Sequence, residues 1–268
     1  MTDRAAACSP ASALADWWAG TRRIGLWGTL AWYDTVLRYR RSLLGPLWIT
    51  VSTGVLLLGM GPVYSGLFNV PLNRFYPHLA AGIILWHFFV SSITEGCQVF
   101  ITAAPWLKQA EFPLAVFVWR SLAKQLILLA HQAVLFVPIA AWAGVGWSPR
   151  QLLAIPGLLV VLVNLHALAI ILGILTARFR DIAPIVSSGL QLAMFLTPVF
   201  WMPDRLPARA RFVLLNPLAQ MLDVVRLPLI NALPAPGTWW FLLGWTSLTV
   251  AVAAALYAAC RRRVVYWI

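Results

Sequence analysis

The sequence predicts an all-α integral membrane protein with six transmembrane helices. It also predicts an N-terminal amphipathic interfacial helix and short re-entrant helices between spans five and six. Of the 268 residues, 61% are hydrophobic and only 10% are charged, and the mean hydropathy is +0.81. Because a soluble domain carries about 25% charged residues, so apolar a chain needs lipid to cover its surface.

The interfacial helix is predicted at residues 12–37, before the first long uncharged stretch. Leucine, isoleucine and tryptophan recur there at helical spacing, beside Asp16, Arg22 and Arg23. A helix of this kind lies in the plane of the cytoplasmic headgroup layer. A plain linker is the alternative for this segment.

Six apolar stretches are long enough to cross a bilayer, which takes about 20 residues of helix. The first is the clearest, since no Asp, Glu, Lys or Arg occurs between Ser42 and Asn73, and Glu95 is the one acid inside the second. The spans are predicted near residues 46–68, 78–102, 117–144, 151–176, 183–202 and 238–260.

The outer re-entrant segment is predicted at residues 203–237. Its apolar part, 212–230, carries Asp223 and Arg226 three positions apart on one helical face, and two prolines interrupt it. Backbone that breaks at membrane depth must pack against protein or line a wet cavity. We therefore expect a pair of short helices at the outer interface and a single permease domain over residues 1–268.

The lysines and arginines orient the spans. Fourteen of the 20 fall on one side of the predicted membrane, and the positive-inside rule makes this side cytoplasmic, with both termini on it. The densest cluster, Arg38, Arg40 and Arg41, holds the start of the first span inside. Topology thus accounts for the net charge of +12, and no stretch interleaves basic and aromatic residues as nucleic-acid binding would require.

No catalytic residue, cofactor or metal ligand is predicted in this chain. Neither Lys108 nor Lys124 follows a glycine-rich, phosphate-binding loop, so ATP hydrolysis is excluded. No histidine has another histidine or an acid within four positions, as a metal site or a general base would need. The three cysteines are far apart and form no disulfide framework.

Polar and aromatic side chains within the spans are the candidates for a translocation pathway. Glu95 has to be protonated, paired or hydrated, whereas Lys124 is expected to extend to the cytoplasmic interface. Aromatic rings could stack against sugar rings, although an interfacial aromatic belt is the alternative. The pathway candidates are Trp86, His87, Phe88, Phe89, Glu95, Phe195, Phe200 and Trp201.

Five short motifs follow one another along the chain. They are RYRRSLLGPLW at 38–48, EFPL at 111–114, ARFRDI at 177–182, TPVFW at 197–201 and LNPL at 215–218. In this order they resemble the type-2 ABC exporter permeases that transport O-antigen, capsular polysaccharide and teichoic acid. The likeness covers nearly the whole chain.

The resemblance implies a multi-pass protein of the bacterial inner membrane that forms a homodimer with the conduit along its interface. Two copies of a separate ATPase subunit would bind ATP and Mg²⁺, and the cargo would be a lipid-linked polysaccharide. The ATPase would contact Trp17, Arg22, Arg23, Glu111, Phe112, Pro113, Arg178 and Asp181. An exit gate would involve Asn216, Pro217, Asp223 and Arg226.

A second role is possible for Arg38, Arg40 and Arg41, because they lie where an anionic pyrophosphate headgroup would approach and arginine forks suit phosphate. Topology and anionic lipid alone are the alternative reading of the three arginines.

Three other functions stay open: an ABC exporter of small amphiphiles or drugs, an integral membrane enzyme acting on lipid-linked sugar, and an ion channel. Few charges within the spans argue against the channel.

Overall fold

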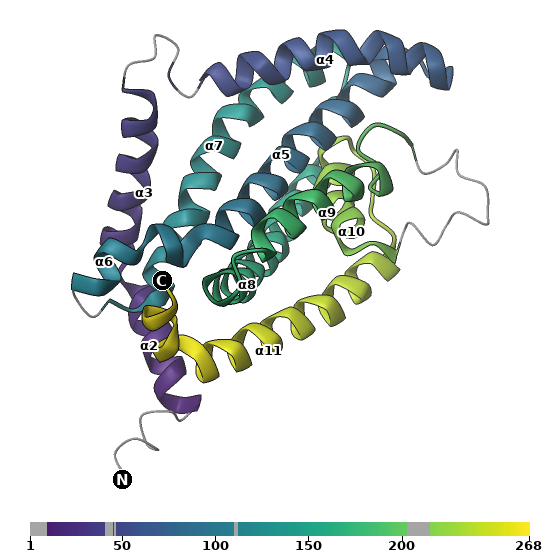
Figure 1. The fold of residues 1–268 in the computed structure, drawn as a ribbon. Coiled ribbons are helices and arrows are strands. Elements are labelled where there is room, and N and C mark those ends of the chain that lie inside the picture. Colours follow the sequence, from purple (N-terminus) through teal and green to yellow (C-terminus); the bar gives the residue numbers. More distant parts are fainter. Residues whose placement is uncertain (1–9, 41–44, 46, 110–111, 203–214) are drawn as a thin grey trace, which may run out of the picture.

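The computed structural model describes residues 10–40, 45, 47–109, 112–202 and 215–268, and these form helices joined by turns (Figure 1). Within these residues, five helical segments are long and apolar enough to cross a membrane. They are α4 (Leu47–Phe68), α5 (Leu72–Thr102) with its continuation α6 (Ala104–Gln109), α7 (Leu114–Trp142), α8 (Ala154–Arg178) with the preceding 3-10 turn η1 (Pro149–Leu153), and α11 (Pro236–Trp267).

The predicted fifth span at 183–202 is shorter than expected. Its helix, α9 (Ile182–Leu196), has 15 residues and is about 22 Å long, against a hydrocarbon core of about 30 Å. Thr197, which ends α9, is extended because it precedes Pro198, whose ring disfavours a helical neighbour. Of the six predicted spans, five therefore correspond to helices of full length, and the fifth corresponds to the short helix α9.

The re-entrant segment contains one helix within the described residues, α10 (Pro217–Leu229). With 13 residues α10 is too short to span, in agreement with the prediction of short helices in this segment. Of the pair of short helices predicted within 212–230, the described residues contain α10, and residues 203–214 lie outside them.

The predicted interfacial helix is two helices, α2 (Pro10–Arg22) and α3 (Ile24–Tyr39), which break at Arg23 where ψ is 51°. At the break, Thr21 accepts a hydrogen bond from the Trp119 indole of α7 at 2.9 Å. The Trp27 ring of α3 stacks on Trp119 with centroids 5.7 Å apart. Packing on α7, rather than one amphipathic face, thus places these helices.

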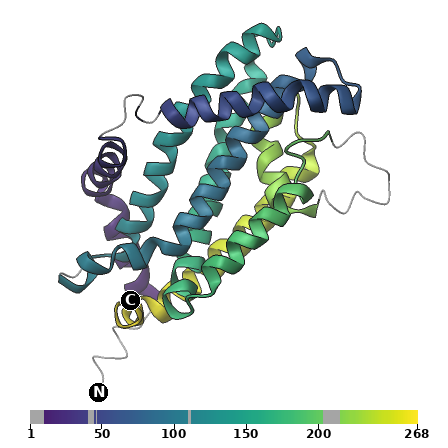
Figure 2. The ribbon, with the colours of Figure 1, turned by 45° about the horizontal axis from the view of Figure 1, so that its top comes forward.

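Helix α4 lies across the upper ends of α5 and α7 instead of running beside them (Figures 1 and 2). The Thr50 hydroxyl donates to the His131 carbonyl of α7 at 3.0 Å, and Gly61 lies against the Tyr76 ring of α5. Only 17% of the α4 span is buried, against 72% of the α5 span. Most of the apolar surface of α4 is thus left for lipid or another chain.

Helix α5 is the centre of the molecule, packed between α7 and α8. Phe75, Leu79, Phe89 and Phe100 are fully buried along it. Close contact with α8 depends on small residues, because a Cβ added at Gly96 would come within 3.0 Å of Ala169. Without a hydrophobic drive between helices in lipid, such close backbone approach is how they associate.

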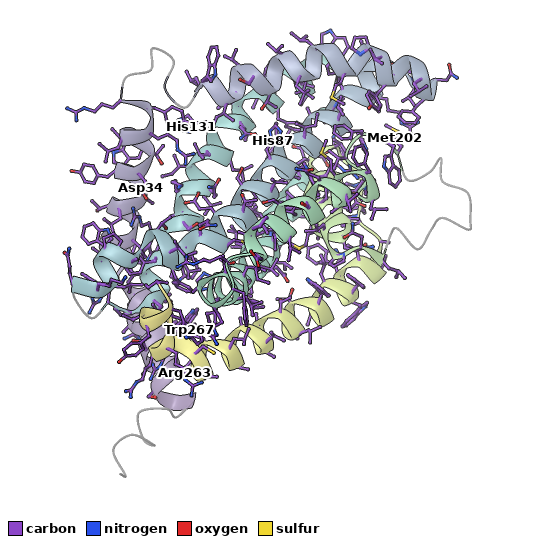
Figure 3. The ribbon with its side chains drawn as sticks, viewed as in Figure 1. Asp34, His87, His131, Met202, Arg263 and Trp267 are labelled. Carbon is purple, nitrogen blue, oxygen red and sulfur yellow. The ribbon has the colours of Figure 1, made fainter. Side chains whose placement is uncertain are left out.

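Two ends of the bundle can be distinguished by their contacts. At one end, which we call the α2 end, α2 lies beside the last turns of α11, where Trp267 and Arg263 are found (Figure 3). There the Tyr257 hydroxyl donates to Asp16 at 2.6 Å. At the other, the α10 end, Asn231 donates to the Gly146 carbonyl at 2.8 Å.

Candidate functional site

A cavity of about 690 Å³ lies among α3, α4, α5 and α7. We call it the charged cavity, because two carboxylates and three cations lie on it. Its polar lining comprises Asp34, Arg38, His87, Ser91, Thr94, Glu95, Gln98, Thr102, Arg120, Ser121, Lys124, Gln125 and Gln132.

Helical spacing explains how these side chains come to share one cavity. On α5 the polar residues His87, Ser91, Thr94 and Gln98 recur every three or four positions and so occupy one face. On α7, Arg120, Lys124 and Gln132 are separated by four and eight positions and so share one face as well. Because α5 packs against α7, the two polar faces oppose each other inside an otherwise apolar bundle.

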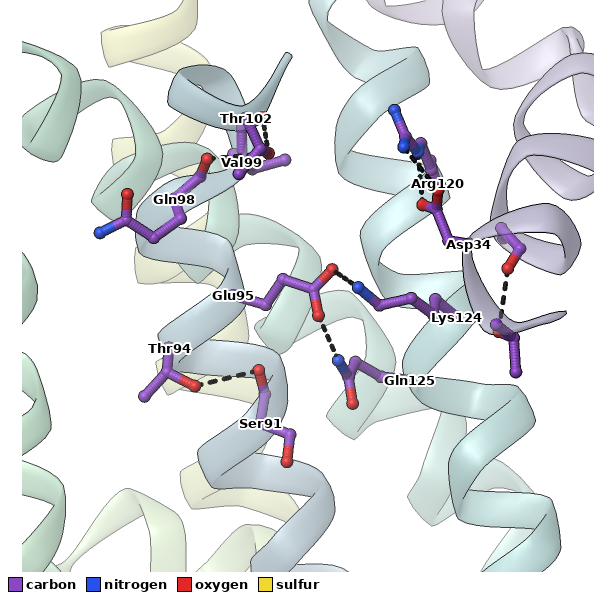
Figure 4. Close-up of polar contacts among 12 residues, drawn as sticks. Asp34, Ser91, Thr94, Glu95, Gln98, Val99, Thr102, Arg120, Lys124 and Gln125 are labelled. Carbon is purple, nitrogen blue, oxygen red and sulfur yellow. Dashed lines mark hydrogen bonds and ion pairs between the residues drawn. The ribbon is translucent and has the colours of Figure 1, made fainter. Parts of the chain in front are cut away.

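Glu95 is ion-paired, one of the three states predicted for it. Its carboxylate pairs with Lys124 and also accepts a hydrogen bond from the Gln125 amide (Figure 4). The Lys124 residue is only 8% exposed, so the expectation that it extends to the cytoplasmic interface is wrong. The carboxylate one helix away gives the ammonium a partner within reach, which removes the need to reach water.

Asp34 and Arg120 form a second ion pair on the same cavity, between α3 and α7. The guanidinium is bidentate: Nε lies 2.6 Å from Oδ2 and Nη2 lies 2.7 Å from Oδ1 (Figure 4). Both side chains are about one quarter exposed. Arg120 and Lys124 are four residues apart on α7, so their heads point toward the same space.

The sequence interpretation missed Asp34 and Arg120 as cavity residues. A signal was available for the two cations, since Arg120 and Lys124 stand at helical spacing just inside an apolar stretch. Asp34 gave no comparable signal, because its partner is 86 residues away in the chain.

The predicted aromatic candidates separate into four environments: the two cavities, the core and the region near the end of α9. Trp86, His87 and Phe200 line a second cavity of about 240 Å³, which also touches α4 and α9; we call it the apolar cavity. It shares His87 and Ser91 with the charged cavity, and Phe88 lines the latter. Phe89 is fully buried in the core and lines neither of these two cavities.

The other two aromatic candidates lie near the end of α9. Phe195 is 72% exposed on the surface. Trp201 is half-buried and donates its indole N–H to the Phe195 carbonyl at 3.3 Å. Neither belongs to the lining of the two cavities.

The four exit-gate candidates lie together at the α10 end. Asn216 caps α10, whose first helical residue is Pro217, by accepting from the Leu218 N–H at 3.0 Å. The Asn216 amide also donates to the Thr197 hydroxyl at 3.0 Å. Arg226 is fully buried and contacts Asp223, the Pro198 carbonyl and His78 of α5. These contacts attach α10 to α5 and to the turn after α9.

Most of the described ATPase-contact candidates gather at the α2 end. Arg22 and Arg178 are exposed, and their guanidinium groups lie over the rings of Trp18 and Trp267, respectively. The candidates Arg23 and Asp181 are exposed too, and the half-buried Pro113 precedes α7.

Two of these candidates also pack inward. The Trp17 indole donates to His166 of α8 at 3.1 Å, and the Phe112 ring packs edge-on against Phe117. Among the headgroup candidates, Arg38 lines the charged cavity and Arg40 is exposed. Glu111 and Arg41 lie outside the described residues.

The family model and the similar proteins agree with one another, since all of them describe transporters. Residues 25–230 match the sequence model of the family described as "ABC-2 type transporter". The chain is 26% identical over 192 residues to the "O-antigen export system permease protein RfbA" of Klebsiella pneumoniae, covering 70% of this chain and 74% of that protein. It is 28% identical over 211 residues to the protein of the same name from Myxococcus xanthus, covering 74% and 77%.

Proposed function

Because the chain belongs to the ABC-2 type transporter family, we propose that it is the membrane subunit of an ATP-driven exporter of lipid-linked, O-antigen-like polysaccharide. As a family member it is a multi-pass transport permease and not an enzyme, which agrees with the resemblance found in its motifs. The names of its relatives support polysaccharide as the cargo.

The charged cavity is the observation that carries the proposal. A chain with only 10% charged residues places two carboxylates and three cations around about 690 Å³ of space inside its helical bundle. Ionisable groups at membrane depth are costly and mark the paths of polar cargo. A hydroxyl-rich glycan and its anionic linkage suit such a lining, and the aromatic rings of the adjoining apolar cavity could stack on sugar faces.

The arrangement of the two ends supports the rest of the assembly. The α2 end carries many of the basic residues assigned to the inner side, so it would face the cytoplasm of the bacterial cell, with both termini there. Two ATPase subunits with ATP and Mg²⁺ would dock on this end of a homodimer. The α10 end would then be the outer exit.

The arginines before α4 would meet the anionic headgroup of the cargo at the inner leaflet. Arg38 lines the charged cavity and Arg40 follows it on the same segment, so both lie near the entrance. Replacing Arg40 and Arg41 with alanine tests this role: export should fall while membrane insertion stays normal. Normal export with normal insertion would remove the headgroup role.

Deletion of the chain tests the proposed function in the cell. Surface polysaccharide should disappear, and lipid-linked polymer should accumulate on the cytoplasmic side of the inner membrane. Re-expression of the chain should restore the surface polymer. Unchanged surface polysaccharide in the deletion strain would contradict the proposal.

The apolar cavity favours a second candidate function, export of a small amphiphile or drug. Its lining by Leu56, Ile83 and Met194 would hold an aliphatic group of limited size. If this is the function, the deletion should leave surface polysaccharide unchanged and instead sensitise cells to an amphiphilic compound.

A further inference from the structure

We infer that the charged cavity binds the phosphoryl group of an amphiphile by ion-pair exchange, in which the incoming group takes Arg120 from Asp34 and Lys124 from Glu95. The inference rests on the proposed function for its biological cargo, but it assigns a binding step to residues on α3, α5 and α7 that the sequence motifs did not include.

The geometry of the Asp34–Arg120 pair carries the first step. Two guanidinium nitrogens hold two carboxylate oxygens at 2.6 and 2.7 Å in a bidentate arrangement. A phosphoryl group presents a similar pair of oxygens to the same fork. Exchange would therefore keep both hydrogen bonds of Arg120 while only the acceptor changes.

Because Lys124 lies close to Arg120, the site suits a ligand group that carries more negative charge than a carboxylate. It lies one helical turn after Arg120, so both cations can reach one diphosphate. Arg38 adds a third cation to the lining, and no ion pair with Arg38 occurs within the described part of the chain. Three cations against two carboxylates leave the cavity with a positive excess.

The two carboxylates that the exchange releases can be hydrated. The Asp34 and Glu95 side chains are 26% and 24% exposed, so each already touches the open space and can be hydrated after the exchange. In a fully buried pair, the released carboxylate would be left without a cation and without access to water. Partial exposure thus makes these two pairs replaceable, unlike the fully buried Arg226.

The exchange would also change how α3 is held. The Asp34–Arg120 pair is the only ion pair joining α3 to α7 among the described residues. A bound phosphoryl group would break it and leave the upper part of α3 attached by packing alone. Occupancy of the cavity would thereby loosen the helix that closes one of its sides.

The neighbouring apolar cavity indicates that the phosphoryl group belongs to an amphiphile rather than to a soluble anion. The two cavities meet at His87 and Ser91 on α5. A ligand with its head at Arg120 could thus place an apolar chain beside Trp86 and Met194. Inorganic diphosphate would use only the charged half.

Equilibrium binding to the full chain in phosphatidylcholine nanodiscs tests the inference with three probes: farnesyl diphosphate, farnesol and inorganic diphosphate. Farnesyl diphosphate should bind most tightly. Equal affinity for farnesol would overturn the phosphoryl site, and equal affinity for inorganic diphosphate would overturn the amphiphile.

Isosteric variants test the exchange itself. Asp34→Asn removes the competing carboxylate and should tighten farnesyl diphosphate binding about threefold, the size of a partly exposed ion pair. Arg120→Gln should weaken it about tenfold or more, as expected for lost charged hydrogen bonds. Asp16→Asn, which alters a carboxylate beside Arg261 at the α2 end, is the matched control and should leave affinity unchanged.

Opposite signs for the two variants are what exchange requires, because a purely structural ion pair would make both weaken binding. Equal weakening by Asp34→Asn and Arg120→Gln would therefore overturn the inference. Arg120→Lys keeps the charge without the fork and should give an intermediate affinity. Binding is scored independently of surface polysaccharide, so failure of the proposed cargo and failure of the site give different results.

Discussion

Arg226 shows how one side chain can organise an end of this protein. It is fully buried, yet it pairs with Asp223 and contacts the Pro198 carbonyl and His78. The sequence predicted that Asp223 and Arg226 share a helical face, and their pairing confirms it. The contacts to Pro198 and His78 could not be predicted, because they join residues 28 and 148 positions apart.

Replacement of Arg226 by methionine should destabilise the protein by about 3 kcal/mol or more, since removing one partner leaves buried polar groups without compensation. Unfolding of the purified protein in detergent measures the loss. Arg150→Met, at an exposed arginine of η1, is the control and should have little effect. If the two variants lose the same stability, Arg226 does not hold the α10 end together.

The charged cavity could be predicted from the sequence only in part. Glu95 was recognised as paired, protonated or hydrated because a lone acid in a span has few options. Its partner Lys124 was misplaced, because sequence alone does not show that the face of α7 carrying it turns toward α5. Tertiary packing made that choice.

At the scale of elements, α10 begins directly after the capping residue Asn216, as the sequence Asn-Pro predicts. Asn216 accepts from the Leu218 N–H and Pro217 occupies the first helical position, an arrangement that favours a helix start. Asn216→Ala should cost about 1 kcal/mol and speed hydrogen exchange in the first turn of α10. Asn216→Asp keeps the cap acceptor and should preserve slow exchange. Equal exchange in both variants would show that the cap is unimportant.

The crossing of α8 and α10 depends on Gly157. A Cβ at this position would come within 2.5 Å of the Val224 carbonyl oxygen, a backbone atom that cannot turn aside. Gly157→Ala should therefore lower the melting temperature in detergent. Gly59→Ala in α4, where nothing lies within 4 Å, should be neutral or slightly stabilising. A Gly157→Ala protein as stable as the Gly59→Ala protein would contradict this packing.

Element predictions succeeded where hydropathy decides and failed where packing decides. The stretches behind α4, α5, α7, α8 and α11 were found because each is long and apolar. The early end of α9 at Leu196 was missed, although Pro198 was a visible signal. The break at Arg23 and the oblique path of α4 left no mark in the sequence, since both depend on which neighbours the helices meet.

At the scale of the whole molecule, the α2 end is the proposed docking surface for the ATPase. Arg22→Glu combined with Arg178→Glu should reduce co-purification of the ATPase subunit, because both side chains are exposed at that end. Arg150→Glu, an exposed arginine at the α10 end, should leave co-purification unchanged. If Arg150→Glu lost the ATPase subunit and the double variant kept it, the docking surface would lie at the α10 end, which would contradict the proposal.

The exposed surface of α4 is available for the interface of the proposed homodimer. Native mass spectrometry of the protein released from nanodiscs should give twice the chain mass of 29.7 kDa. A mass of one chain, in the presence of the ATPase subunits as well as in their absence, would contradict a dimeric conduit.

The most direct measurement is transport by the reconstituted chain and its ATPase subunit in sealed vesicles loaded with lipid-linked polysaccharide on the ATPase side. The account predicts that polymer reaches the opposite side only when both subunits and Mg-ATP are present. Transfer by the chain alone, or no transfer by the complete and ATP-hydrolysing complex, would contradict the central claim.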